Sequence, residues 1–278
     1  MSDPRLTPAN ARVMAAHLGD DGSGRTRVTA KHRQIAVPLI DLLRRPDGPR
    51  DRQLLLGDLV DVYEAEGETS FVQARKDGYV GYVPTSALAP EQEPTHTVSA
   101  PATHAYTNAD LKSSDRHALS FGCALTVTAV KGSFAQTPVG FVPTQHLRPL
   151  TTPQADPLVV AELFLGTPYL WGGNSRSGID CSGLVQAACL ACHIPCPGDS
   201  DQQEQNLGRS LPDGTAYERG DLLFWKGHVA WVASDTTLIH ANAHHMATCF
   251  EDITATINRI QSAGDGPVTA HKRLLPKS

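Results

Sequence analysis

Residues 180–196 read DCSGLVQAACLACHIPC and hold four of the six cysteines in a chain of 278 residues. Such a stretch is compatible with a metal site, a haem attachment site, a set of disulfides, or one reactive thiol among inert ones. Each possibility requires a different surrounding for the sulfur atoms. The choice between them therefore decides the fold of the C-terminal half of the chain.

The metal and haem possibilities rest on Cys189, Cys192, His193 and Cys196. The first three form the C-x-x-C-H pattern of haem attachment, a reaction that takes place outside the cytoplasm. The N-terminus, MSDPRLTPANARVMAAHLGD, has no apolar run long enough for a signal-peptide core, so we expect a cytoplasmic protein with reduced cysteines. No second C-x-x-C completes a zinc site. We expect no cofactor and no metal, and five cysteines that are small buried side chains.

Cys181 differs from the other cysteines through its position. A helix is predicted from about residue 181 to residue 191, ending before Pro195, with one buried stripe formed by Leu184, Val185, Ala188 and Cys192. A cysteine that begins a helix lies near unpaired backbone N–H groups and the positive end of the helix dipole, which lower the pKa of a thiol. Gly183 keeps the next turn slim, which we interpret as room for a substrate.

Two histidines offer the base that a reactive thiol needs. His228 and His240 lie twelve residues apart in HVAWVASDTTLIHAN, which reads as two strands and a turn. Folding about residue 234 places the two histidines directly opposite each other, with Cβ atoms about 5 Å apart. Cys181, His228 and His240 then supply nucleophile, base and orienting group. Either histidine alone would be read as an ordinary polar residue on a strand.

The N-terminal half reads as β-structure. Residues 52–89 alternate with period two around an Asp77–Gly78 turn. The end of that segment, GYVGYVPTSALAP (78–90), is echoed by TPVGFVPTQHLRPL (137–150), which indicates two copies of one small β-barrel. The net charge of −5 and pI near 6.2 argue against nucleic-acid or anionic-membrane partners, and no window has the apolar length of a membrane span.

The motifs YLWGGNSRSGIDCSGLVQAA, RGDLLFWKGHVAWV and LIHAN resemble, in order, those of the NlpC family of papain-like cysteine peptidases. The β modules resemble bacterial SH3 domains, and the combination resembles the dipeptidyl-peptidase VI type. The resemblance implies a multidomain fold, with two small SH3-like β-barrels followed by an α+β papain-like catalytic domain. The expected boundaries are an extension at 1–30, SH3-like domains at 31–90 and 96–150, and a peptidase domain at 156–278.

The same resemblance implies an activity and a substrate pocket. Members of the dipeptidyl-peptidase VI type cleave the bond between γ-D-glutamate and an L-diamino acid in murein peptides. For this chain the resemblance implies Cys181 as nucleophile, His228 as base and His240 as third member. The free amine of an N-terminal L-Ala is expected to bind Asp180 and Ser182, and by position Ser200. The remaining pocket residues are expected to be Tyr169, which could hold the oxyanion or be a core aromatic, and Tyr79 or Tyr82 from the first SH3-like domain.

Other interpretations stay open at this point. Asp180 could simply cap the helix that follows it. His240, His244 and His245 could be a metal cluster, but spacings of four and then one do not place all three on one face, so surface histidines are expected. The chain could also be a thiol amidase or acyltransferase, or a non-catalytic SH3 protein that binds peptides. We expect a monomer that recycles murein peptides, and the preferred diamino acid does not follow from the sequence.

Overall fold

The computed structural model describes residues 3–19 and 22–274. Four residues of the expected N-terminal extension (1–2 and 20–21) and the last four of the expected peptidase domain (275–278) lie outside the described residues. The chain divides into two compact units, one ending at Thr152 and the other beginning at Pro153. The finer division into an extension, two β domains and a peptidase domain remains a prediction. No helix among the described residues is long and apolar enough to cross a membrane.

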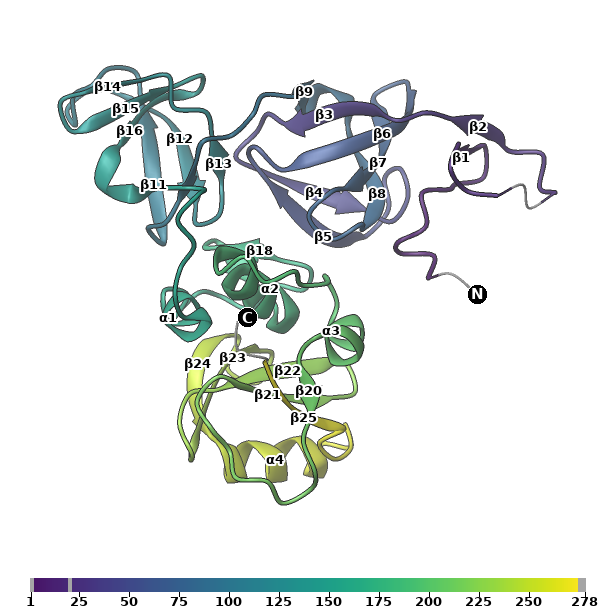
Figure 1. Cartoon of the computed structure of the whole chain (residues 1–278), viewed down its shortest axis with the longest axis vertical. Coiled ribbons are helices and arrows are strands. Elements are labelled where there is room, and N and C mark those ends of the chain that lie inside the picture. The colour runs from purple at the N-terminus through teal and green to yellow at the C-terminus, as the bar shows by residue number, and fades with distance from the viewer. Residues whose placement is uncertain (1–2, 20–21, 275–278) are drawn as a thin grey trace. The chain divides into compact units, whose positions relative to one another are not determined.

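The first β domain is one antiparallel sheet with the strand order β5-β4-β8-β7-β6-β3-β9 (Figure 1). Burial alternates along β8 and the first half of β6, whereas β7, which the sequence also predicts to alternate, has three consecutive buried residues. Gly78 takes the positive φ of 79° that the turn between β7 and β8 needs. The strands are β3 (Lys31–Ile35), β4 (Leu39–Leu43), β5 (Arg50–Leu55), β6 (Leu59–Glu66), β7 (Thr69–Ala74), β8 (Val80–Pro84) and β9 (Leu88–Pro90). Before them, β1 (Val13–Ala15) pairs in parallel with β2 (Thr26–Val28).

The second β domain consists of a three-stranded and a five-stranded sheet. Its strands are β10 (His96–Val98), β11 (Ala102–Tyr106), β12 (Asp115–Ser120), β13 (Ala124–Leu125), β14 (Ala129–Lys131), β15 (Phe134–Thr137), β16 (Gly140–Pro143) and β17 (Leu147–Pro149). The repeated V-P-T motif forms the same structure in both domains: β8 leads through a 3₁₀ turn at Thr85–Ala87 to β9, and β16 leads through one at Thr144–His146 to β17. The count of two SH3 barrels remains a prediction.

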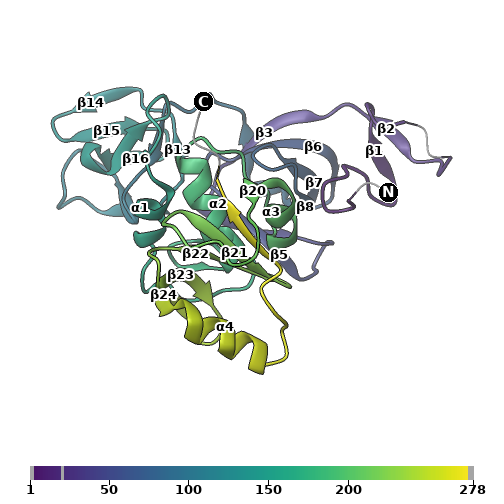
Figure 2. The same ribbon diagram turned by 60° about the horizontal axis from the view of Figure 1, so that its bottom comes forward.

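The C-terminal unit combines helices with a six-stranded sheet of order β20-β25-β21-β22-β23-β24. Its helices are α1 (Pro157–Glu162), α2 (Cys181–Ala191), α3 (Ser200–Asn206) and α4 (Ile253–Ser262). The strands are β18 (Asn174–Ser175), β19 (Gly178–Ile179), β20 (Arg209–Ser210), β21 (Asp221–Trp225), β22 (His228–Val232), β23 (Thr237–Asn242), β24 (Ala247–Asp252) and β25 (Ala270–Arg273). Figure 1 and Figure 2 both show the sheet between α2 and α4.

Helix α2 has the bounds that the sequence predicts, and its surroundings explain why. The expected stripe is buried, but so are Gln186 and Cys189, so α2 is a central helix rather than a half-exposed one. The helix ends at Ala191, before Pro195 as predicted, and His193 turns to a positive φ of 56° between the two.

The role expected for Gly183 is wrong. A Cβ at this position would lie 2.6 Å from the carbonyl oxygen of Gly173, so the glycine allows a close approach of backbone rather than of substrate.

Candidate active site

The nucleophile expected from the sequence lies at the N-terminus of α2. Asp180 caps the helix: its Oδ1 accepts from the Gly183 backbone N–H at 2.6 Å and from the Ser182 hydroxyl at 3.1 Å, and its Oδ2 accepts from the Gly172 N–H at 2.9 Å. The helix-cap interpretation of Asp180 is therefore confirmed. A carboxylate offers about four acceptor positions, so the cap does not prevent the same group from binding a cation.

Burial and charge set the acidity of Cys181. The side chain is 6% exposed. Burial, and next the carboxylate of Asp180, raise the pKa of the thiol to about 12, against backbone N–H groups of Val229, Ser182 and Cys181 itself that lower it. The expectation that the helix N-terminus gives Cys181 a low pKa is wrong, because burial of the thiol outweighs the N–H donors. The Val229 N–H also places the sulfur beside the residue that follows His228.

His228 and His240 meet as expected, but through a different register. Trp231 pairs with Ile239 and Val232 with Leu238. Continued at that register, Asn242 rather than His240 lies opposite His228. The predicted direct opposition is wrong by two residues, and because the shift is even, both histidines stay on one face. Diagonal neighbours are within reach of long side chains, and His228 Nε2 lies 2.8 Å from His240 Nδ1.

Two charged residues that the sequence analysis did not identify extend this network. His240 Nε2 lies 2.7 Å from Glu251 Oε2 on β24, and the Arg259 guanidinium on α4 donates to the same oxygen at 2.7 Å. In the β23–β24 pairing Glu251 lies opposite Leu238, one diagonal step from His240. The only sequence signal for Glu251 is an acidic residue in the strand that returns after LIHAN.

His240 is buried and His228 is half-buried, and both are uncharged. Burial, together with the neighbouring charges of His240 and Arg259, lowers the pKa of His228 to about 3, while Glu251 acts in the opposite direction. Burial likewise lowers the pKa of His240, against the hydrogen bond to Glu251. For Glu251, burial raises the pKa, but hydrogen bonds and charges of His240 and Arg259 outweigh it and lower the value to about 2. The carboxylate is therefore ionised beside two neutral imidazoles.

The other expected pocket residues of this unit are Tyr169, Ser182 and Ser200. Burial raises the pKa of the Tyr169 hydroxyl, and the charges of Cys181 and Asp180 raise it further. Tyr169 therefore lies within electrostatic range of both groups. Ser182 is buried and donates to Asp180. Ser200 is buried in the first turn of α3.

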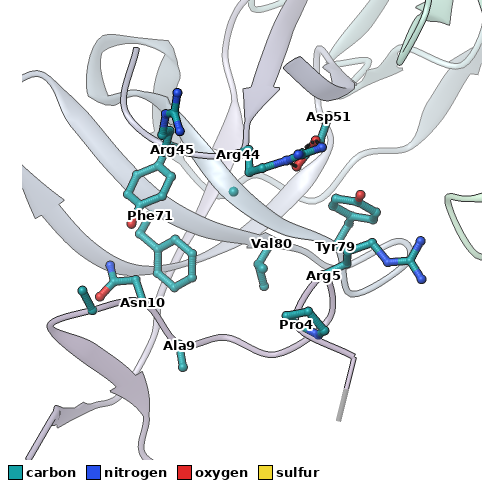
Figure 3. Close-up of a pocket in the computed structure, with 13 residues that line it drawn as sticks. Pro4, Arg5, Ala9, Asn10, Arg44, Arg45, Asp51, Phe71, Tyr79 and Val80 are labelled. Carbon is teal, nitrogen blue, oxygen red and sulfur yellow. Dashed lines mark hydrogen bonds and ion pairs between the residues drawn. The ribbon is translucent and has the colours of Figure 1, made fainter. Parts of the chain in front are cut away.

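The two candidate tyrosines of the first β domain differ in burial. Both line a cavity of about 550 Å³, which Pro4, Ala9 and Asn10 of the N-terminal extension also line (Figure 3). Tyr79 belongs to the domain core at 4% exposure, whereas Tyr82 is half-buried and packs on Phe71, with ring centroids 5.2 Å apart. Tyr82 is therefore the one whose side chain remains available on the surface.

The cysteines and histidines considered as metal ligands differ in burial. Cys189, Cys192 and Cys196 are buried, whereas Cys249 is partly exposed, contrary to expectation, and accepts from Asn242. His244 is exposed, as expected. His245, Cys249 and Glu251 bring ligand-type atoms within 4.8 Å of one another. Glu251 is, however, already hydrogen-bonded to His240 and Arg259. The positive charge of Arg259 opposes binding of a metal cation between His245, Cys249 and Glu251.

Comparison with protein-family models gives two matches. Residues 42–88 match the bacterial dipeptidyl-peptidase SH3 domain, and residues 166–260 match the NlpC/P60 family. The second match contains Cys181, His228, His240 and Glu251. The first contains Tyr79 and Tyr82.

Individual known proteins are similar to the same parts of the chain. A γ-D-glutamyl-L-lysine dipeptidyl-peptidase of Bacillus subtilis is 33% identical over 193 residues, 62% of this chain and 63% of that protein. One of Bacillus cereus is 38% identical over 101 residues, 33% of this chain and 30% of that protein. The chain thus matches less than two thirds of the length of either relative. The crystal structure of an NlpC/P60 family protein from Bacillus cereus has a TM-score of 0.74 at 22% identity, covering 88% of this chain and all of that one, which shows a common fold.

Proposed function

Because the chain belongs, through its C-terminal unit, to the NlpC/P60 family of cysteine peptidases, we propose that it hydrolyses the amide between γ-D-glutamate and an L-diamino acid in murein peptides with a free N-terminal L-Ala. The observation that carries the chemistry is the hydrogen-bonded His228–His240 pair, whose neighbour Val229 directs its backbone N–H at the Cys181 thiol at the start of α2. The substrate class is supported by two relatives named γ-D-glutamyl-L-lysine dipeptidyl-peptidases.

Proton transfer begins at the imidazole of His228. Its Nε2 is engaged by His240, which leaves Nδ1 for the thiol of Cys181. As the sulfur attacks the amide carbonyl, the thiol proton passes to Nδ1, and a tetrahedral oxyanion forms. The Cys181 backbone N–H at the helix N-terminus and the Tyr169 hydroxyl are the donors for that oxyanion.

Collapse of the tetrahedral intermediate breaks the C–N bond. His228 returns its proton to the departing amine of the diamino acid, and an L-Ala-γ-D-Glu thioester remains on Cys181. His228 then removes a proton from water, which attacks the thioester. The second collapse expels the thiolate, His228 returns the proton to it, and the free enzyme is restored.

Asp180 gives the proposed site its preference for a free amine. Its carboxylate is 8% exposed and lies beside the thiol, where a substrate ammonium would neutralise its charge. Intact murein carries this L-Ala with a blocked amine, so the proposed enzyme acts on peptides already released from the wall. We place it in cytoplasmic recycling of murein peptides, acting as a monomer without a cofactor.

Incubation with L-Ala-γ-D-Glu-L-Lys and with its meso-diaminopimelate analogue, followed by mass spectrometry, tests the proposal. We expect L-Ala-γ-D-Glu and the free diamino acid from at least one of the two peptides. Cys181→Ala should release neither product, at unchanged thermal stability. If both peptides stay intact while Cys181 still reacts with iodoacetamide, the chain acts as a thiol amidase or acyltransferase on another acyl donor, and the proposed substrate is wrong.

A further inference from the structure

We propose that Glu251 is a positioning residue of the active site: it fixes the tautomer of His240, and through His240 that of His228, while Arg259 holds Glu251 in place. The inference rests on the proposed cysteine peptidase function. It assigns a role to two residues outside the cysteine and histidine set that the sequence motifs indicate.

The tautomers follow from the donors and acceptors along the network. An ionised carboxylate only accepts hydrogen bonds, so the His240 nitrogen 2.7 Å from Glu251, Nε2, must carry the proton. In a neutral imidazole the other nitrogen, Nδ1, is then bare and accepts. Its partner at 2.8 Å, Nε2 of His228, must therefore be the donor. What remains is a bare Nδ1 on His228, which is the form that a general base needs.

Arg259 holds the Glu251 carboxylate in place through a second hydrogen bond. Arg259 comes from α4, whose residues Ile253 and Ile260 pack on Ala230, Val232 and Leu238 of the sheet. His240 and Glu251 share the sheet face of Leu238, because side chains alternate along a strand and Leu238 pairs with Glu251. The charge-assisted hydrogen bond from Arg259, 2.7 Å long, therefore fixes Glu251 between the helix and β23.

The charge of Glu251 also matters once the reaction starts. When His228 takes the thiol proton, a positive charge forms on a buried imidazole, and the carboxylate beyond His240 stabilises it. Charged or titratable groups reach the pair from several elements: Glu251 of β24 and Arg259 of α4 act on both histidines, His245 of the turn before β24 acts on His240, and Cys249 of β24 is the strand partner of His240. Glu251 is the acidic group among them that accepts directly from His240.

The chain contains a matched control for this trio. Asp221 on β21 is also buried, and it accepts from His271 Nε2 at 2.8 Å and from Arg273 Nε at 2.7 Å. It lies at the opposite end of β21 from Trp225, the strand partner of His228. A carboxylate bound by a histidine and an arginine thus occurs a second time in this unit, and it does not touch the histidine pair in any contact of the described residues.

The test compares Glu251→Gln with Asp221→Asn in the full chain. Two readouts are used: kcat and KM on L-Ala-γ-D-Glu-L-Lys, and the pH dependence of Cys181 alkylation by iodoacetamide, read by mass spectrometry on the Cys181 peptide. Glu251→Gln should lower kcat roughly 10- to 100-fold with KM within about twofold, and should slow alkylation near pH 7 to a similar degree. Asp221→Asn should lower thermal stability and leave both readouts within about twofold.

A second variant is needed if Glu251→Gln folds poorly because Arg259 loses its charged partner. Glu251→Gln combined with Arg259→Met removes both charges, and it should fold and show the same loss of kcat. The inference is overturned if either Glu251 variant keeps wild-type kcat and alkylation, or if Asp221→Asn causes an equal loss. Alkylation needs no peptide. If the wild type does not cleave the peptide but is alkylated faster than Glu251→Gln, the proposed substrate is contradicted and the role of Glu251 is not.

Discussion

Asp180 influences Cys181 in two opposing ways at the scale of a single residue. Its negative charge raises the pKa of the neighbouring thiol, second only to burial. In the proposed complex a substrate ammonium cancels that charge, so that the correct substrate itself favours loss of the thiol proton. A peptide with a blocked amine leaves the carboxylate uncompensated and the thiol protonated.

Replacement of Asp180 by Asn separates these effects. Asn still accepts from Gly183, because it caps helices nearly as well as Asp. Alkylation of Cys181 near pH 7 should become faster, since the negative charge is gone. Cleavage of L-Ala-γ-D-Glu-L-Lys should become slower, by roughly 10- to 100-fold in kcat/KM, since a hydrogen-bonded ion pair is lost. Faster alkylation with unchanged peptide cleavage would leave Asp180 as a helix cap only.

Acid should destabilise the protein through the buried histidines. Burial lowers the pKa of His228 from 6.5 to about 3, so between these values the unfolded chain binds a proton that the folded chain does not. Stability is therefore complete above about pH 6.5 and is lost as the pH falls toward 3. Urea unfolding at pH 7 and pH 5 should show a lower free energy at pH 5, and a smaller difference in His228→Gln. An equal pH difference in that variant would show that other groups cause the loss.

At the scale of elements, α2 and the β22–β23 hairpin show what the sequence can and cannot predict. Local signals define α2: the Asp180 cap and the apolar stripe predict its bounds. The hairpin register depends on how many residues the turn uses, which alternation alone does not specify, so the prediction missed it by two residues while keeping the correct face.

The remaining gaps in the predicted site concern contacts between distant segments. Glu251 and Arg259 reach His240 from a third strand and from a helix that the sequence analysis did not relate to it. Gly183 was misread for the same reason, because the backbone that crowds it belongs to Gly173, outside the helix. Residue type and spacing thus identified Cys181, His228 and His240 as candidates, whereas the contacts of Glu251 with His240 and Arg259 required the packed structure.

Gly183→Ala tests the packing of the α2 N-terminus. The new Cβ would lie 2.6 Å from the Gly173 carbonyl oxygen and 3.0 Å from Asp180 Oδ1, so the helix must shift together with Cys181. We expect a loss of about 1–3 kcal/mol in the free energy of unfolding and a clear fall in kcat/KM. Gly19→Ala, where nothing lies within 4 Å, is the control and should change neither. Wild-type kinetics in Gly183→Ala would mean that the contact does not position the thiol.

At the scale of the whole molecule, the N-terminal unit is predicted to take part in substrate selection. The resemblance assigns an aromatic of the first SH3-like domain to the substrate pocket, and Tyr82 is the candidate with an accessible ring. The second β domain carries a comparable pair, in which Tyr106 packs edge-on against Phe134 with ring centroids 5.9 Å apart. These two tyrosines allow the role of the first domain to be separated from a general effect on β structure.

Tyr82→Ala should raise KM for L-Ala-γ-D-Glu-L-Lys with a smaller change in kcat, because the resemblance assigns Tyr82 to substrate binding while Cys181, His228 and His240 are unchanged. Tyr106→Ala should lose similar packing and leave both constants unchanged. Steady-state kinetics and thermal unfolding of the two variants provide the comparison. Equal KM values for Tyr82→Ala and the wild type would remove Tyr82 from the substrate pocket.

The measurement that tests the central claim most directly is the rate of cleavage of L-Ala-γ-D-Glu-L-Lys compared with its N-acetylated form. Acetylation removes the ammonium and leaves the buried negative charge of Asp180 without a compensating cation, although its hydrogen bonds from Gly172, Ser182 and Gly183 remain. Loss of one partner of a buried ion pair typically costs about 3–5 kcal/mol. The proposed site therefore predicts kcat/KM for the acetylated peptide lower by roughly 100-fold or more, and intact murein sacculi left undigested. Equal cleavage of the two peptides, or solubilisation of sacculi, would contradict the claim and indicate a general murein endopeptidase.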